Sequence, residues 1–374
     1  MKIKDIEAIP LEIPLTQPKK MARSTVHKAR MVITRITTDR GITGIGECPA
    51  APYMSGDSVA SVLYALKEII KPAILGMDCF NIESVFGIME RLIHGNYAAK
   101  CAVDIALYDA VGKALGVPVY HLLGGRFRDH LRVTWHLANA DLELDLAEAD
   151  EALKQGYEIL KLKVGTRDLR ADVLRTWETA KTLNAKVALR LDANQAWDAA
   201  RAKIFLQAVD GCRLDFLEQP VAWWDLDGMA RIASASPLPI NADEGIFTAE
   251  DAYRHVRLKA ADILSVKLLK AGGLTGARRV AAVAEATDTP IHLAAKIAET
   301  SVATAAAVHL GVALRRLEYD ASTTSHYLAD DIVQTPLRPK GGTIGPPNGP
   351  GLGVELDMEK IKAYRMDREG KFTI

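Results

Sequence analysis

The strongest constraint on the fold is a repeat in residues 126–330. Short apolar runs alternate there with amphipathic segments of helical periodicity at a nearly constant interval, and each run except the last is followed by such a segment. We predict strands in this region at residues 132–138, 159–165, 186–194, 214–220, 238–244, 263–269, 290–295 and 316–322. Eight strands that alternate with helices over about 190 residues are typical of a TIM-type barrel. A doubly wound sheet is the rival α/β architecture, but the Gly-rich first turn of that fold is missing.

The first third of the chain follows a different pattern. Alternating β-branched runs predict an antiparallel meander at residues 6–15, 31–39 and 45–47. Helical periodicity follows at residues 58–75, 81–93 and 98–116. Residues 15–30 are polar and contain proline, which predicts a long loop. We therefore expect an α+β domain over residues 1–125, completed by the Gly/Pro-rich segment 331–374, beside a barrel domain over residues 126–330.

Charge and cysteine content limit the class of partner. Forty-seven Lys and Arg balance forty-seven Asp and Glu, so no global basic field draws the protein to nucleic acid or to an anionic membrane. The four cysteines are far apart and form no CxxC pair, which indicates buried thiols rather than a disulfide framework. The chain has neither a signal-peptide core nor the ~18 consecutive apolar residues of a membrane span. We expect a cytoplasmic protein that acts on a small molecule.

Three acidic residues stand at the ends of consecutive predicted strands. They are Asp192, Glu218 and Asp243. Glu218 follows Asp192 by 26 residues, Asp243 follows Glu218 by 25, and Lys267 follows Asp243 by 24. Since the carboxyl ends of parallel barrel strands share one face, these carboxylates are expected to meet at the barrel mouth. Oxygen ligands of this kind suit a hard divalent cation such as Mg²⁺ or Mn²⁺.

Lysines on either side of these carboxylates indicate a reaction. Lys161 and Lys163 are two residues apart on one strand and share a face, and Lys267 comes from a strand beyond the carboxylates. Removal of a proton next to a carboxylate creates an ene-diolate, which a divalent metal and a fixed lysine can stabilise. Neighbouring cations also lower the pKa of a lysine, so that it can act as a base.

The chain resembles the enolase superfamily in its muconate-lactonising subgroup. The matching segments are KLKVG, LDANQAWD, LEQP, ADE, SVKLLKAGG, GNYAAKCAVDIALYDAVGKALGVPVYHLLGG and GPGLGVELD. Within the subgroup, PKKMARSTVHKARMVITRI, VTWHLANAD and YLADDIVQTPLR look most like muconate cycloisomerases. The resemblance implies a (β/α)7β barrel with an α+β capping domain, a divalent metal that is Mg²⁺ or Mn²⁺, and a homo-oligomer that is often an octamer.

The resemblance also implies roles for the residues at the barrel mouth. The three carboxylates would bind the metal, and Lys163 and Lys267 would be the acid/base pair on opposite faces of the substrate. Lys161 would add positive charge near the substrate carboxylate and lower the pKa of Lys163. Asn194 and Glu244 would orient the metal-binding carboxylates without binding the metal themselves.

Two loops of the capping domain are implied to close over the barrel. They correspond to Leu15–Val26 and Pro49–Ser58, whose polar candidates for substrate contact are Ser24, Thr25 and Tyr53.

Further candidates for substrate contact come from the barrel itself. His136 ends the first predicted strand, and Lys296 and Glu299 follow the seventh. In this subgroup an acidic residue at the end of the eighth strand helps to select the substrate, and Asp320 is the nearest match. The DxD of dipeptide epimerases is absent here, which disfavours that reaction, and Asp320 is one residue away from the glutamate position of muconate cycloisomerases.

The sequence therefore predicts a metal-dependent isomerase that transfers a proton at the carbon α to a carboxylate through an enolate, most like a muconate cycloisomerase. Racemisation or epimerisation of an N-substituted amino acid is an alternative, as is dehydration of a hydroxy acid. A metal-dependent carboxylate-binding protein without activity is the alternative from a different class.

Overall fold

The structure is a computed structural model that describes residues 1–22, 24–166, 168–183 and 187–367. Within these residues eight parallel strands form a closed barrel, with the eighth strand paired to the first through Ala321 opposite Val133. They are β4 (Leu131–Leu137), β5 (Ile159–Lys163), β6 (Ala188–Asp192), β7 (Leu217–Glu218), β8 (Ile240–Ala242), β9 (Ile263–Val266), β10 (Ile291–Leu293) and β11 (Ala321–Ser322). The predicted barrel is confirmed, and Lys186, in the strand predicted at 186–194, lies outside the described residues.

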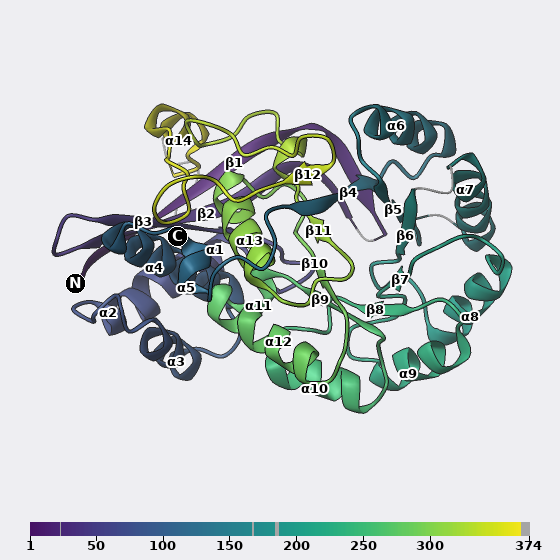
Figure 1. Ribbon diagram of the computed structural model, residues 1–374, viewed down its shortest axis with the longest axis horizontal. Coiled ribbons are helices and arrows are strands. Elements are labelled where there is room, and N and C mark those ends of the chain that lie inside the picture. The colour runs from purple at the N-terminus through teal and green to yellow at the C-terminus, as the bar shows by residue number, and fades with distance from the viewer. Residues whose placement is uncertain (23, 167, 184–186, 368–374) are drawn as a thin grey trace.

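Helices cover the outside of the barrel (Figure 1). They are α6 (Leu142–Lys154), α7 (Leu169–Thr182), α8 (Ala199–Ala208), α9 (Leu226–Ala235), α10 (Ala249–Arg257), α11 (Leu268–Ala271), α12 (Leu274–Ala286) and α13 (Ser301–Ala313). Six of these helices begin at an Asp or Thr whose side chain accepts a hydrogen bond from the first turn. The 3₁₀ turn η2 (Ser325–Tyr327) follows β11 where a helix would continue the repeat, which confirms the (β/α)7β arrangement.

The capping domain is an antiparallel sheet covered by helices. Its strands are β1 (Ile3–Met21), β2 (Ser24–Thr38) and β3 (Thr43–Pro49), paired in that order. Its helical elements are α1 (Val59–Tyr64), η1 (Ala65–Ile70), α2 (Lys71–Ile74), α3 (Ile82–Leu92), α4 (Tyr97–Leu115) and α5 (Val119–Leu122). Gly44 and Gly46 let the alanine-rich helix α4 lie directly on β3, because a Cβ at either position would stand 2.0 Å from a carbonyl oxygen of α4. The meander and the α+β cap are therefore as predicted.

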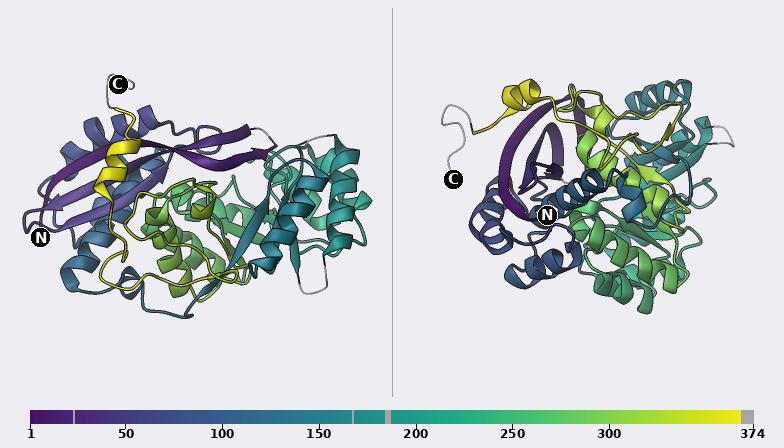
Figure 2. Two further views of the ribbon diagram at one scale, coloured as in Figure 1. Left: turned by 90° about the horizontal axis from the view of Figure 1, so that it is seen from above. Right: turned by 60° about the vertical axis from the view of Figure 1, so that its left-hand side comes forward.

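The predicted loop at residues 15–30 is wrong. β1 and β2 continue through this region as a hairpin, with Lys20 opposite Thr25 and Met21 opposite Ser24, and Arg23 lies outside the described residues. A register shift between Pro14 and Lys19 accommodates the proline-containing segment. The hairpin extends from the cap to the α6 side of the barrel (Figure 2, left). There the backbone N–H of Lys20 donates to the carbonyl of Ala138 at 2.8 Å.

The C-terminal segment contacts both parts of the molecule. β12 (Thr343–Ile344) pairs with β4 of the barrel, whereas α14 (Met358–Tyr364) packs on β1 of the cap. The backbone N–H of Leu352 donates to Asp109 of α4 at 2.8 Å. In the described part of the chain no helix has the length and apolar character that a membrane span requires.

Glu47 of β3 fixes the cap to the barrel. Its buried carboxylate accepts hydrogen bonds from the N–H of Thr300 at 2.9 Å, from the hydroxyl of Thr300 and from the N–H of Ala303 at 3.0 Å, at the start of α13. A helix N-terminus attracts a carboxylate in this way. Burial nevertheless raises the pKa of Glu47 to about 7, although the hydrogen bonds from Thr300 and Ala303 act in the opposite direction.

We expect this carboxyl group to make the unfolding free energy fall as the pH rises. Because its ordinary pKa is 4.5, the folded protein holds a proton between pH 4.5 and 7 that the unfolded chain has released. Stability from this group is then lost through that range, by up to about 3 kcal/mol. Urea unfolding at pH 5 and pH 7.5 checks this. The unfolding free energy of Glu47→Gln, relative to that of the native protein, should be higher at pH 7.5 than at pH 5. A difference independent of pH contradicts the assignment.

Candidate active site

Three carboxylates lie at the carboxyl ends of neighbouring strands. Asp192 ends β6 and is opposite Glu218, which ends β7, and Asp243 follows β8. All three side chains are buried. The register of the parallel strands therefore brings together the acidic residues that the sequence places about 25 positions apart.

Each of these carboxylates binds a buried lysine. The Nζ of Lys163 donates to Asp192, that of Lys161 to Glu218 at 2.5 Å and that of Lys267 to Asp243. Buried charges are tolerated when they are paired in this way. All six residues predicted from the strand ends are thus in one cluster.

The cluster shifts the titration of its members. Burial lowers the pKa of Lys161, and the carboxylates of Glu218 and Asp192 oppose that effect only in part. Burial also acts to lower the pKa of Lys267, but nearby carboxylates, first that of Asp243, outweigh it and raise that pKa. Burial alone would raise the pKa of Asp243, yet Lys267 and Lys270 hold it well below its usual value.

Lys270 and His292 also belong to this cluster, although neither was predicted from the sequence. Lys270 is fully buried, and its Nζ donates to the carbonyl of Asp243 and, at 2.7 Å, to the Oδ1 of Asp243. A signal was present, because Lys270 follows Lys267 by one helical turn in an apolar segment. His292 of β10 bonds the carbonyl of Tyr319 through Nδ1, so that its Nε2 is free to accept from Lys161 at 2.9 Å.

Asn194 and Glu244 are joined to the cluster by hydrogen bonds. The amide of Asn194 accepts from Lys163 at 3.1 Å and donates to Glu244 Oε1 at 3.2 Å. The backbone of Asn194 has a φ of 40°, in the left-handed region that asparagine tolerates. Burial raises the pKa of Glu244 to about 8, and Asp243 and Asp192 add to the increase.

The donor set fits a divalent cation. Each carboxylate bonds a lysine, and in the described part of the chain no group of three or more His, Cys, Asp or Glu side chains is arranged to hold a metal ion. The three carboxylates nevertheless offer oxygen ligands, which Mg²⁺ and Mn²⁺ prefer. The buried Oε2 of Glu244 has no hydrogen-bond partner in the described residues. A cation bound among these carboxylates would offset the cost of burying that unpaired oxygen.

His136 lies inside the barrel beside the lysines. It is near the end of β4, is buried, and its Nε2 is 3.2 Å from the Oγ of Ser322. Burial holds the pKa of His136 well below its usual value, and the charges of Lys161 and Lys163 lower it further. Both effects favour the neutral imidazole.

The candidates from the cap lie along a cavity of about 460 Å³ that Lys296 of the barrel also lines. Ser24, Thr25 and Tyr53 are among its lining residues. Tyr53 as a whole is 41% exposed, but desolvation of its hydroxyl raises the pKa of that group to about 12, and the charge of Lys267 acts in the opposite direction. Glu299 is buried, and its carboxyl group accepts a hydrogen bond from the backbone N–H of Lys296 at 3.0 Å.

Asp320 is not at the end of the eighth strand, so its sequence-based placement is wrong. β11 begins at Ala321, which puts Asp320 before the strand. Arg132 donates to both oxygens of its carboxylate, at 2.9 and 3.0 Å, and Arg190 donates to one of them at 3.0 Å. The polar residues at the true end of this strand are Ser322 and Thr323.

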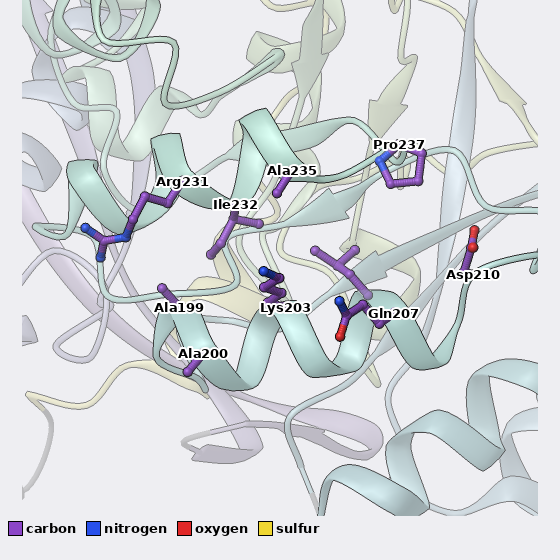
Figure 3. Close-up of a pocket in the computed structure, with 10 residues that line it drawn as sticks. Ala199, Ala200, Lys203, Gln207, Asp210, Arg231, Ile232, Ala235 and Pro237 are labelled. Atoms are coloured by element: carbon purple, nitrogen blue, oxygen red, sulfur yellow. The ribbon is translucent and has the colours of Figure 1, made fainter.

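A larger cavity, of about 570 Å³, lies between α8 and α9 on the outside of the barrel (Figure 3). Lys203, Gln207 and Arg231 are among the residues that line it, and none of the predicted site residues does. The volume of a cavity therefore does not identify the candidate active site. The cluster of buried charged groups identifies it instead.

Comparison with protein families decides the identity. The model for "Enolase C-terminal domain-like" proteins matches residues 145–360, and the model for "Mandelate racemase / muconate lactonizing enzyme, N-terminal domain" matches residues 5–124. This chain belongs to the enolase superfamily. The matches cover both the barrel and the cap, and they confirm the resemblance to the muconate-lactonising subgroup.

Relatives in the enolase superfamily carry out different isomerisations. The L-Ala-D/L-Glu epimerase of Bacillus subtilis (strain 168) is 37% identical over 95% of this chain and 97% of its own length. The structure of a muconate lactonizing enzyme from Pseudomonas fluorescens, complexed with muconolactone, matches with a TM-score of 0.94 and 34% identity over 97% of this chain and 99% of that chain. The N-succinyl Arg/Lys racemase from Bacillus cereus ATCC 14579 matches with a TM-score of 0.94 and 32% identity over 98% of each chain. This protein is therefore an isomerase of the enolase superfamily.

We expect Lys270→Met to destabilise this enolase-superfamily isomerase. The substitution leaves the Oδ1 of Asp243 without its buried partner, and removal of one member of a buried ion pair typically costs about 3–5 kcal/mol. Urea unfolding of the metal-free protein measures the loss, with Lys203→Met on the exposed face of α8 as the control. Equal stability of the two variants would show that Lys270 does not stabilise the cluster.

Proposed function

We propose that this protein is a divalent-metal-dependent isomerase that transfers a proton at the carbon α to a carboxylate through an enolate. Its reaction is most like that of a muconate cycloisomerase. A single observation carries the proposal: two buried lysines, Lys163 and Lys267, stand at the two ends of a row of three carboxylates.

The strand order supports opposed roles for these lysines. Lys163 ends β5 and Lys267 follows β9, while the strands that carry the carboxylates, β6, β7 and β8, lie between them. A substrate carboxylate held at the middle of this row would have one ammonium group on each side. The metal would be held by Asp192, Glu218 and Asp243. When bound, it acts as a Lewis acid that stabilises the negative charge of the enolate.

In cycloisomerisation one lysine suffices. One carboxylate oxygen of cis,cis-muconate adds to a carbon of the conjugated chain, and the C–O bond forms as electrons move toward the other carboxylate. Lys163 then donates a proton from Nζ to the carbon α to that carboxylate. The structural likeness to the muconate lactonizing enzyme of Pseudomonas fluorescens supports this assignment.

Racemisation or epimerisation of an N-substituted amino acid is the second candidate. The observation that favours it is that Lys267 is as buried as Lys163 and also bonds a carboxylate. One lysine would take the α-proton from one face, and the other would return a proton to the opposite face, with no net change in composition. The likeness to the N-succinyl Arg/Lys racemase supports this reading.

Two assays with Mg²⁺ or Mn²⁺ separate the candidates. Loss of cis,cis-muconate is followed by ultraviolet absorbance, and polarimetry follows N-acyl and N-methyl amino acids. We expect turnover in one of the two assays. Absence of turnover in both, together with binding of a carboxylate, would favour the non-enzymatic binding protein.

A further inference from the structure

In the described part of the chain, the cavity between cap and barrel is lined by cationic side chains and not by anionic ones. We call this space of about 460 Å³ the cap cavity; among its lining residues are Ser24, Val26, Pro52, Tyr53, Ser58 and Lys296. None of the described residues that line it is an Asp or a Glu. Its cationic side chains are Lys28, Arg30 and Lys296, and His27 also lines it. A cavity of this composition favours an anionic ligand.

Lys296 is the buried cation of the cap cavity. Lys28 and Arg30 are exposed, and both pair with Glu12, at 2.6 and 2.8 Å. Lys296 in contrast is only 3% exposed. Among the described residues it has no ion pair within 4.0 Å, and its Nζ makes one long hydrogen bond, of 3.4 Å, to the carbonyl of Ile297.

The carboxylates nearest to Lys296 do not satisfy its ammonium group. Glu47 is engaged by three donors at the start of α13. Glu299 accepts the backbone N–H of Lys296 rather than its Nζ. A buried ammonium without a good acceptor is costly, and burial accordingly lowers the pKa of Lys296. An anion in the cap cavity would offset this cost.

The cap cavity lies next to the proposed catalytic cluster. Tyr53 lines the cavity, and the charges of Lys267 and Glu244 act on its hydroxyl. Lys296 follows β10 and Lys267 follows the paired strand β9, so both lysines come from the carboxyl ends of neighbouring barrel strands. One substrate could therefore reach from the carboxylate row to Lys296.

We propose that Lys296 binds a second carboxylate at the far end of the substrate, in the cap cavity. The substrate class is then a dicarboxylate, and an acid with an ammonium group at that end is disfavoured. This inference rests on the proposed proton transfer for the position of the reacting end. The role of Lys296 is to bind and select substrate, and it takes no part in the proton transfer.

The test compares N-succinyl-L-alanine with N-succinamoyl-L-alanine, in which an amide replaces the distal carboxylate. Both are titrated calorimetrically and assayed for exchange of the α-proton in D₂O with Mg²⁺. Because a hydrogen bond to a buried charged group is typically worth 1.5–3 kcal/mol, we expect the native protein to prefer the dicarboxylate by about 10- to 100-fold in affinity and in kcat/KM.

Variants assign that preference to a residue. Lys296→Met should remove the preference and leave the amide compound unaffected, whereas Lys296→Arg should retain part of it. Lys28→Met is the matched control, since Lys28 lines the same cavity but is exposed and paired, and it should keep the full preference. Equal losses for both compounds in Lys296→Met, or binding of neither compound by the native protein, would overturn the inference. Lys296-dependent binding without proton exchange would instead count against the racemase candidate of the proposed function and leave this site intact.

Discussion

Lys163→Ala and Lys267→Ala should each lower the rate of α-proton exchange by about 10²- to 10⁴-fold, the usual contribution of a general acid or base. Each variant removes the ammonium group that the proposed mechanism uses on one side of the substrate position. If the protein is a racemase or epimerase, the loss depends on the enantiomer: one variant stops exchange from the L form, and the other stops exchange from the D form. If it is a cycloisomerase, Lys163→Ala abolishes turnover of cis,cis-muconate.

Deuterium incorporation at the α-carbon, followed by NMR for each enantiomer, measures this effect. Lys203→Ala is the control, because it removes an exposed lysine of α8 on the outside of the barrel. Urea unfolding of both active-site variants verifies that they are folded. Turnover retained in Lys163→Ala would refute the mechanism.

Glu218→Gln should weaken binding of Mg²⁺ or Mn²⁺ by more than about 100-fold, since even groups that only orient a ligand contribute 10- to 100-fold. Glu218 is the middle member of the carboxylate row, opposite Asp192 on β6 and Asn241 on β8. The neutral amide keeps the size of the side chain but removes the negative charge that a divalent cation requires. Activity should fall with the metal affinity.

Calorimetric titration of the protein with the metal alone gives the affinity directly. Glu151→Gln is the matched control, because it removes an exposed carboxylate of α6 and should bind metal as the native protein does. An unchanged affinity in Glu218→Gln would mean that this carboxylate serves only as the partner of Lys161.

The barrel and the charged cluster were predictable because their pattern is periodic. Asp192 and Glu218 each stand where an apolar run ends, and the parallel register of β6 and β7 converts equal sequence spacing into adjacency. Lys161 and Lys163 interrupt an apolar strand, where unpaired charges would be too costly unless acidic partners were near. The cluster therefore follows from local sequence and the rules of the fold.

The hairpin at the tip of β1 and β2 was not predictable from local sequence. Gln17 and Pro18 are typical of a loop, and the strand conformation there depends on contacts with distant residues. The Nζ of Lys19, which is fully buried, bonds Glu148 of α6 at 2.5 Å. Such tertiary contacts override local preference.

Asp320 and His292 illustrate the limit at the level of single side chains. The sequence shows that Asp320 is near a strand end, but not that Arg132 and Arg190 bind its carboxylate. His292 occupies an inward position in an apolar strand, which is also where a core histidine stands, and only its contact with Lys161 relates it to the site. The homo-oligomeric state and the cytoplasmic location stay predictions.

Exchange of the α-proton tests the central claim most directly. The native protein, with Mg²⁺ or Mn²⁺, is incubated in D₂O with muconolactone and with a panel of N-acyl amino acids, and NMR follows the α-carbon. The proposed mechanism predicts that at least one of these carboxylates gains deuterium at that carbon, and that Lys163→Ala stops the exchange where Lys163 faces the proton. If carboxylates bind and none of them exchanges, the protein does not transfer a proton at this position and the claim is contradicted.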